Sequence, residues 1–537
     1  MGIGLTLVLA VVAIAVGAAC SNPPQVVDIS PQRGATDVHS NAPIRVKFDR
    51  GMDRGSVESR FHVAPAVAGS VRWLNDDELT FEHEAFTPRT RYQAILDPGY
   101  RDAHGITNGL RHSWNFKTEA PPDLAAASPG NGDRDVDPAA YITLTFSRDM
   151  DPASLSGALS LSPSAPFHMR QDATDRRRFT LAPDSLLDQR VTYSVTVSAD
   201  ARDVDGNYVA NSSVVTFTTG DFRALRHWVG FIAEPWPGSG QKADGVWIVN
   251  ESRFPRRLVE APVTAFSWSA DGSQLLLRSP GGSWSDQPLA GAAKPLPMVG
   301  EWADFLAPGL GYAFLDGGKL QVLKPDGSTI LIASGVKAAA VAPGGGRLAF
   351  VVADASTSGS EIYGYDPDPR TAYRLQVEPA PIDGLAWSAD GLSLAYRVAT
   401  SDPLRHQIKV RSLKDGGVVT VVAGEVSVPT WQADRRHVLF TAVVASGQGP
   451  VTKAFRLAVG DPPPKELTPG LGMPTGSTSV GALSPSADGH QLAFVSDDGG
   501  PVAVWTMNAD GSAVTALTQY DSDSFPYSCS AVAWTPN

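Results

Sequence analysis

The chain has only two cysteines in 537 residues, Cys20 and Cys529. So few cysteines exclude a disulfide framework, and stability has to come from apolar cores. Basic runs are also missing and the formal net charge is −12, which argues against a nucleic-acid partner. Hydrophobic residues make up 42% of a chain that is longer than one domain usually is, so we expect several domains with large cores.

Motifs of common enzyme classes are missing as well. There is no Gly-x-Ser-x-Gly motif, and the ten histidines are scattered without a His-x-x-x-His pair or another metal-ligand spacing. Cys529 lies in an apolar stretch and is predicted to be a buried thiol rather than a nucleophile. We therefore expect a protein that is not an enzyme and has no cofactor or metal; a hydrolase or lyase site built from distant loops is the alternative.

The N-terminus is the one long apolar segment. Residues 3–19 are almost wholly apolar and end in small residues directly before Cys20, which is typical of an export signal at residues 1–20. This arrangement resembles the bacterial lipobox, and the resemblance implies lipidation of Cys20. An uncleaved anchor helix is the alternative, because spanning a bilayer takes about 17–25 residues. Either way we expect an exported protein, anchored in the membrane at the periplasmic or extracellular face of the cell envelope.

Two similar segments follow each other in the first half of the chain. Residues 30–38 match residues 128–136, and residues 44–53 match residues 142–151, both at an offset of 98 residues. Apolar and polar residues alternate within each copy, which is typical of β-strands with one buried face. Each copy has about 100 residues, the size of a β-sandwich of roughly seven short strands.

The motifs shared by the copies are an opening Ser-Pro-x-x-Gly-x-x-x-Val, a Phe-x-x-x-Met-Asp turn and a closing Phe-x-Thr. They resemble the bacterial Ig-like domain of the S-layer SbsA type, which implies Ig-like domains at residues 24–119 and 122–220. In that family such domains are spacers or adhesive modules on the cell surface. Asp53 and Asp151 could bind calcium, but a turn cap in which Asp accepts backbone N–H groups explains them better.

A different repeat begins near residue 223. Trp-Ser-Ala-Asp-Gly occurs at residues 268–272 and 387–391, and degenerate copies recur at about 44 residues. An aromatic strand, an Asp-Gly turn and a second strand form a hairpin, and this period predicts the four-stranded blades of a β-propeller. Seven markers predict seven blades: Asp271, Pro308, Gly344, Asp390, Asp434, Asp488 and Asn537.

The last marker has no strand after it, whereas residues 226–231 look like the strand that follows Asp434. We therefore expect the C-terminal strand to pair as the innermost strand of the first blade and close the ring. The repeat resembles the WD40-like repeat of TolB-type propellers over residues 223–537. The predicted fold is all-β: two Ig-like β-sandwiches followed by a seven-bladed β-propeller.

The repeat also divides the aromatic residues into two groups. The tryptophans at the shared repeat position are predicted to pack between blades: Trp268, Trp387, Trp431 and Trp534. The loops on the face opposite the Asp-Gly turns form the candidate binding face, with Trp236, Trp284, Asp354, Asp402, Arg405, His406, Asp497 and Asp498. Trp236 and Trp284 lie among Pro, Gly and Ser, so we expect them to be exposed and suited to recognition; chance surface aromatics are the alternative.

These features together predict a non-enzymatic lipoprotein of the cell envelope. Its Ig-like spacers would present the propeller to an envelope or surface protein. The alternative is binding of cell-wall glycan through Trp236 and Trp284.

Overall fold

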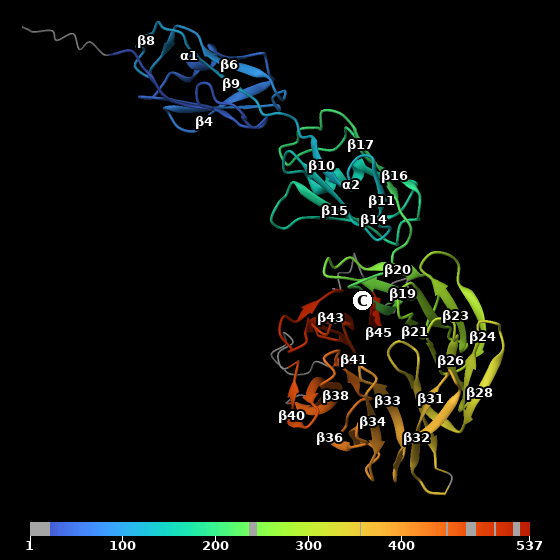
Figure 1. The fold of residues 1–537 in the computed structure, drawn as a ribbon. Helices are drawn as coiled ribbons and strands as arrows, with labels where there is room; N and C mark the ends of the chain where they lie inside the picture. The colour runs from blue at the N-terminus through green and yellow to red at the C-terminus, as the bar shows by residue number, and fades with distance from the viewer. Residues whose placement is uncertain are drawn as a thin grey trace, which may run out of the picture.

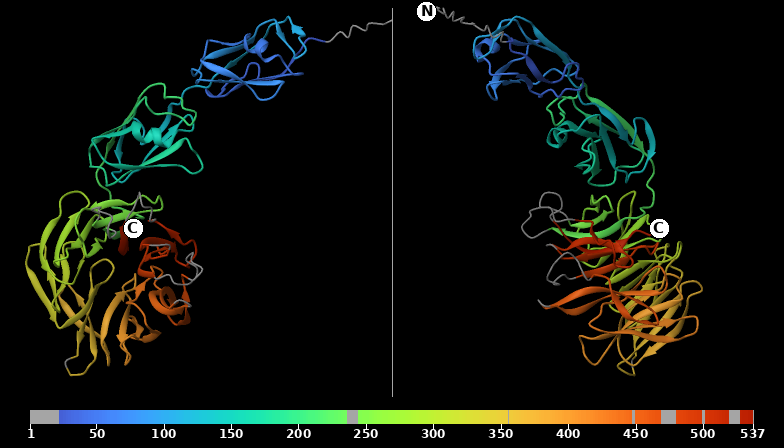
Figure 2. Two further views of the ribbon diagram at one scale, coloured as in Figure 1. Left: turned by 180° about the vertical axis from the view of Figure 1, so that it is seen from behind. Right: turned by 90° about the vertical axis from the view of Figure 1, so that its left-hand side faces the viewer.

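The computed structural model describes residues 22–235, 244–354, 356–446, 449–468, 480–498, 501–518 and 527–536. Two sandwiches and a larger ring of sheets follow one another along the chain (Figure 1). Views from behind and from the side show the same serial arrangement (Figure 2). The expected signal segment, with Cys20, lies outside the described residues. Within the described ranges, no helix has the length and apolar character needed to cross a membrane.

The first sandwich packs a sheet of order β1-β2-β5-β4 against a sheet of order β3-β6-β9. In β2 the side chains of Ile44, Val46 and Phe48 are buried and those of Arg45 and Lys47 are exposed, as the alternation predicts. The elements are β1 (Val26–Ser30), β2 (Ile44–Phe48), α1 (Arg54–Glu58), β3 (Phe61–Ala64), β4 (Gly69–Trp73), β5 (Glu78–His83), β6 (Arg91–Leu96), β7 (Tyr100–Arg101), β8 (Thr107–Asn108) and β9 (His112–Lys117).

The second sandwich repeats this plan with sheets of order β10-β12-β15-β14 and β11-β17-β16-β13. Its elements are β10 (Leu124–Ser128), β11 (Asp133–Val136), β12 (Ile142–Phe146), α2 (Pro152–Ala158), β13 (Leu159–Ser162), β14 (Phe167–Gln171), β15 (Arg178–Pro183), β16 (Thr192–Val197) and β17 (Ser213–Thr219). Asp53 and Asp151 cap α1 and α2 by accepting backbone N–H groups, which is the capping role expected from the sequence.

The third module consists of seven four-stranded sheets, which confirms the predicted seven-bladed propeller. Blade 1 contains β18 (Val229–Pro235), β19 (Gly245–Val249), β20 (Arg256–Val259) and β45 (Tyr527–Trp534). Blade 2 contains β21 (Ala265–Trp268), β22 (Gln274–Arg278), β23 (Ser283–Pro288) and β24 (Lys294–Val299). Blade 3 contains β25 (Trp302–Phe305), β26 (Tyr312–Asp316), β27 (Lys319–Leu323) and β28 (Thr329–Ser334). Blade 4 contains β29 (Val336–Val341), β30 (Leu348–Ala353), β31 (Ser360–Asp366) and β32 (Thr371–Glu378). Blade 5 contains β33 (Ile382–Trp387), β34 (Ser393–Ala399), β35 (His406–Ser412) and β36 (Val418–Gly424). Blade 6 contains β37 (Thr430–Trp431), β38 (His437–Ser446), β39 (Gly449–Ala458) and β40 (Asp461–Glu466). Blade 7 contains β41 (Val480–Pro485), β42 (Gln491–Ser496), β43 (Ala503–Asn508) and β44 (Thr515–Ala516).

The two ends of the propeller segment meet in blade 1. Its strand order is β20-β19-β18-β45, and β45 pairs antiparallel with β18, with Val229 opposite Trp534 and Ala233 opposite Cys529. The backbone N–H of Thr535 extends the ladder by donating to the carbonyl of Trp228 at 2.8 Å. The predicted closure of the ring by the C-terminal strand is therefore confirmed.

The propeller core lies between the blades. Each pair of neighbouring blades shares one apolar cluster; Phe231 and Cys529 of blade 1, for example, pack with Ala493 and Val504 of blade 7. Trp387 and Trp431 are 7% and 6% exposed, and Trp268 and Trp534 are half-buried in these clusters. The repeated tryptophans pack between blades, as predicted.

The second sandwich is joined to the propeller through a buried arginine. Arg256 of β20 is fully buried, and its guanidinium donates to the carbonyls of Ala139 and Ala140 at 2.7 and 3.1 Å. The same group lies over the ring of Tyr141, 4.3 Å from its centroid, and burial lowers its pKa to about 10. Because both carbonyls belong to the sandwich, this contact fixes the two modules against each other.

Candidate functional site

The Asp-Gly turns and the candidate loops lie at opposite ends of the blades. In blade 5, Asp390 accepts hydrogen bonds from the Ser388 hydroxyl at 2.6 Å and the Leu392 N–H at 3.0 Å, and Gly391 has a φ of +66°. This turn joins the first strand to the second. The connection from the second strand to the third therefore emerges at the other end, which we call the loop face; the connections between consecutive blades emerge there too.

Apart from Trp284 of blade 2, the structure places the described sequence-predicted residues in three blades of the loop face. Asp354 begins the connection in blade 4, Asp402 and Arg405 lie in that of blade 5, and His406 is the first residue of β35. Asp497 and Asp498 follow β42 in blade 7. Trp236 lies outside the described residues, as does Cys20.

Trp284 is not an exposed aromatic, and that expectation was wrong. It is 3% exposed and lies second in β23, where it packs in the apolar cluster between blades 2 and 3. Its indole N–H donates to the carbonyl of Gly300 at 3.2 Å. The connection before β23 is short, so Trp284 already belongs to the strand, and strand alternation turns it towards the next blade.

Two of the predicted aspartates are engaged in shaping their own loops. Asp354 accepts from the Ser356 N–H at 2.8 Å and from the hydroxyls of Ser356 and Thr357 at 2.7 and 2.8 Å. These donors lower the pKa of Asp354 to about 2. Asp402 likewise accepts from the Leu404 N–H at 3.0 Å. Both carboxylates stabilise turns through local hydrogen bonds.

A charged cluster in blade 5 includes a residue that the sequence reasoning missed. Asp383, the second residue of β33, accepts from Arg397 Nε at 2.8 Å and from Arg397 Nη2 at 2.6 Å. His406 Nε2 lies 3.6 Å from the same carboxylate. The first strand of a blade starts at the loop face, so an acidic residue at the start of such a strand is the signal that could have identified Asp383.

Two grooves flank blade 5 on the loop face. The larger, of about 660 Å³, lies between blades 5 and 6. It is lined by charged Arg405 and Glu425 and by apolar residues that include Val426, Phe440 and Phe455. The smaller, of about 390 Å³, lies between blades 4 and 5 and is lined by Lys337, Asp354, Ile382 and Asp383 among others.

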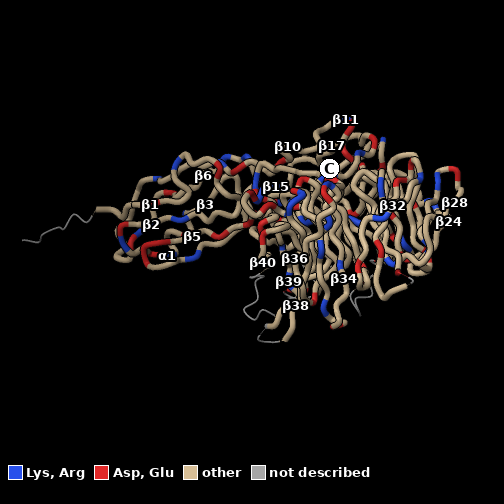
Figure 3. Tube along the Cα trace, turned by 60° about the horizontal axis from the view of Figure 1, so that its bottom comes forward, with Lys and Arg blue, Asp and Glu red and all other residues tan. Residues whose placement is uncertain are grey.

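Apolar side chains are exposed on the loop face of blades 5 and 6. Leu404, next to Arg405, is 68% exposed, Val428 in the connection from blade 5 to blade 6 is 42% exposed, and Val443 of β38 is 39% exposed. Elsewhere on the propeller, basic and acidic residues are interspersed (Figure 3). We call Leu404, Arg405, Glu425, Val428 and Val443 the blade 5–6 patch. An exposed apolar patch with charged groups at its margin is typical of a protein-binding surface.

Outside the loop face, the structure describes a thiol and a possible metal-binding cluster. Cys529 is buried, and burial raises the pKa of its thiol to about 12, so it is the inert thiol that the sequence predicts. One group of His, Asp and Glu side chains in the described ranges is close enough to hold a metal ion, and it lies between the two sandwiches rather than in the propeller: His39, Glu119 and Asp205.

The geometry defines a class of protein, two Ig-like β-sandwiches in series with a seven-bladed β-propeller. Residues 21–118 and 119–219 each match the model of the bacterial Ig-like domain, so both sandwiches belong to that family. No curated protein matches the sequence of the chain.

Solved structures similar to this chain include two TolB structures and a propeller domain of a protease. TolB from Acinetobacter baumannii is 14% identical over 71% of this chain and 83% of its own, with a TM-score of 0.37. A protein assigned as TolB from Agrobacterium tumefaciens is 18% identical over 58% of this chain and 99% of its own, with a TM-score of 0.35. The β-propeller domain of the Trilobed protease from Pyrococcus furiosus is 11% identical over 47% and 71%, with a TM-score of 0.31.

Proposed function

We propose that this protein is a non-enzymatic component of a bacterial cell envelope that binds another envelope or surface protein through the loop face of its propeller. In this proposal the export signal directs the chain out of the cytoplasm, lipidated Cys20 anchors it, and the Ig-like sandwiches act as a spacer. The observation that carries the proposal is the blade 5–6 patch. Arg405, Glu425 and Val443 line its groove, and Leu404 and Val428 are exposed in the neighbouring connections.

The joint between spacer and propeller supports this role. Arg256 is buried against Ala139 and Ala140, and an apolar cluster of Ala139, Leu225, Trp228 and Ile248 surrounds the joint. A stiff joint keeps the loop face in a fixed orientation relative to the sandwich, which reduces the ordering entropy lost when a partner binds.

A protein partner fits the patch better than a glycan does. The glycan alternative needs exposed aromatic rings as stacking platforms, and Trp284 is 3% exposed. The charged groups near the grooves also have structural partners, because Asp354 is held by Ser356 and Thr357 and Asp383 is held by Arg397. These contacts favour a binding surface over a hydrolase or lyase site.

Site-specific photo-crosslinking in intact cells tests the proposal, and blade 5 offers a matched pair of positions. Leu404 and Leu392 are both exposed, at 68% and 51%, but Leu404 lies on the loop face and Leu392 in the Asp-Gly turn at the opposite end of β34. We expect a crosslinker at residue 404 to give one discrete protein adduct and a crosslinker at residue 392 to give none.

A second arm connects the adduct to the patch. Val428→Glu places a charge in the patch, and Arg405→Glu reverses a charge that lines the groove. Both changes should abolish the adduct at residue 404 while leaving the melting temperature unchanged. Absence of a discrete adduct at residue 404, or the same adduct at residue 392, would refute the proposal. Retention of cell-wall glycan by the purified protein that is lost in Val428→Glu would replace it with the glycan alternative.

A further inference from the structure

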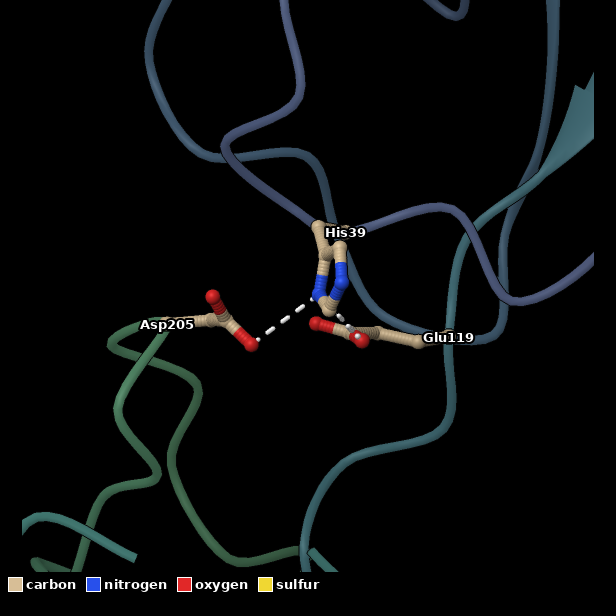
Figure 4. A group of neighbouring side chains, drawn as sticks. All are labelled: His39, Glu119 and Asp205. Atoms are coloured by element: carbon tan, nitrogen blue, oxygen red, sulfur yellow. Dashed lines mark hydrogen bonds and ion pairs between the residues drawn. The ribbon is translucent and has the colours of Figure 1, made fainter. Parts of the chain in front are cut away.

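The two sandwiches meet at a polar joint that brings together residues far apart in sequence. Ser40 donates its hydroxyl to the side-chain oxygen of Asn207, and Asn41 donates its side-chain N–H to the carbonyl of Asp205. Glu119, at the connection between the modules, is fully buried beside them. His39 and Glu119 thus come from one side of the joint, and Asp205 comes from a turn of the second sandwich (Figure 4).

Three potential metal-ligand atoms converge in this joint. His39 Nδ1 lies 3.0 Å from Asp205 Oδ2 and 3.1 Å from Glu119 Oε2. All three ligand atoms lie within 4.8 Å of one another. Bonds of about 2.0–2.2 Å to a tetrahedral zinc ion place ligand atoms about 3.3–3.5 Å apart, so the two distances from His39 Nδ1 need to lengthen by only a few tenths of an ångström to accommodate the ion.

The carboxylate of Glu119 is held in place by neighbours that are not ligands. Asn207 Nδ2 donates to Glu119 Oε1 at 2.7 Å, the backbone N–H of Ser40 donates to the same oxygen at 3.4 Å, and Arg148 donates to Oε2. A carboxylate oxygen has two lone pairs, so Oε2 can accept from Arg148 and still face the ion. Hydrogen bonds of this kind orient ligating carboxylates in metal sites.

The charges of the joint also favour a cation. Asp203 is 2% exposed and accepts a hydrogen bond from Asn207 Nδ2 at 3.0 Å. It adds a third carboxylate beside Glu119 and Asp205. Arg148 is the arginine that reaches this group, at Glu119. Three carboxylates against one guanidinium leave a negative excess that a divalent ion would offset.

We propose that His39, Glu119 and Asp205 bind one divalent transition-metal ion of the zinc type, which ties the two sandwiches together. One imidazole nitrogen and two carboxylate oxygens form a ligand set that suits zinc, whereas calcium prefers oxygen ligands alone. His39 keeps a side-chain exposure of 63%, so the ion reaches the site from solvent and water completes its coordination. Binding adds a bond set that spans the joint and stabilises its closed arrangement.

Zinc titration of the purified full chain, prepared without a histidine tag, tests the inference. We expect calorimetry to show one tight site per chain that is weakened at least ten-fold in His39→Ala and in Asp205→Asn. X-ray absorption at the zinc edge should show one imidazole and oxygen ligands. Asn207→Ala removes a support of Glu119 rather than a ligand, and we expect it to weaken binding by about 10–100-fold.

His168 provides the matched control. Its Nδ1 lies 2.7 Å from Asp184 Oδ1, and the two side chains are about half exposed, so it is a histidine–aspartate pair outside the joint. His168→Ala should leave zinc affinity unchanged. The inference is overturned if the protein binds no zinc, if His39→Ala or Asp205→Asn binds zinc as the unaltered protein does, or if His168→Ala weakens binding equally. Melting curves without zinc show that each variant is folded.

Discussion

Trp387 donates its indole N–H to the backbone carbonyl of Ala340, 3.1 Å away on the first strand of the preceding blade. Trp431 makes the same bond to Ala386 one blade further on, also at 3.1 Å. At these two positions the tryptophan links neighbouring first strands as well as filling the space between blades, whereas the indole nitrogens of Trp268 and Trp534 are buried without a hydrogen-bond partner. This bond gives the repeat motif a structural role that burial alone does not describe.

Replacing Trp387 by Phe tests the value of this bond. The change removes the N–H and part of the ring, and we expect the free energy of unfolding to fall by about 1–2 kcal/mol. Trp505→Phe is the control, because the indole nitrogen of Trp505 is buried without a hydrogen-bond partner. Chemical denaturation measures both. A loss for Trp505→Phe as large as that for Trp387→Phe would contradict a specific contribution of the bond.

Deleting residues 530–537 should destabilise the whole propeller. The deletion removes Val532 and Trp534 from the interface of blades 1 and 7 and leaves residues 229–232 of β18 unpaired. Loss of these half-buried side chains together with the strand pairing should strongly lower the melting temperature and make the propeller sensitive to proteolysis. Removing only residues 536–537 keeps β45 and is the control. If the longer deletion melted like the full chain, ring closure would contribute nothing to stability.

Asp304 should make the propeller less stable as the pH rises from 4 to 6. Asp304 belongs to β25, and its carboxyl accepts from the hydroxyl of Ser267 in β21 at 2.6 Å and has its pKa raised to about 6 by burial. The folded chain then keeps a proton that the unfolded chain releases above its ordinary pKa of 3.8, so stability falls between these values.

Asp304→Asn removes this charge and keeps an oxygen for Ser267. We expect it to raise the free energy of unfolding at pH 7 by roughly 1–3 kcal/mol, and the melting temperature with it, and to have little effect at pH 4. Asp316→Asn, at an exposed position of the same blade, is the control. An equal effect of Asp304→Asn at both pH values would show that the charge is not responsible.

Arg256 should determine the stiffness of the joint between sandwich and propeller. Arg256→Ala leaves the carbonyls of Ala139 and Ala140 without their donors, at a cost of about 1–3 kcal/mol for each group that stays buried. We expect small-angle scattering to show a wider range of particle dimensions. Arg256→Lys keeps the charge but loses the two-pronged contact and should be intermediate. Arg226→Ala, at an exposed position nearby, should change nothing.

The repeat was predictable from sequence because its signals are local. An Asp-Gly turn after an aromatic strand, or a degenerate copy of it, recurs about every 44 residues on average, and this period predicted the blade number even where Phe305 and Val341 replace the tryptophan. The pairing of β45 with β18 followed from the same count. Hairpins are specified by residues a few positions apart, so the sequence contains what is needed to place them.

The failures concern side chains whose surroundings are set by distant segments. Trp284 lies among Gly and Ser in sequence, yet its burial is decided by blade 3. The joint that contains His39 and Asp205 brings together residues 166 positions apart in two separately folding modules. No local pattern encodes such a contact, which is why the joint between the sandwiches was found only in the structure.

The pairing of β45 with β18 also sets an order of events during synthesis. The sandwiches and blades 2 to 7 can form as the chain emerges, because all strands of each sandwich or blade lie within one continuous segment of the chain. Blade 1 cannot, since its innermost strand is made some 300 residues after its neighbour. Until β45 is made, β18 has an unpaired edge that can associate with other chains. A chaperone that protects this edge would therefore be needed most between the synthesis of the two strands.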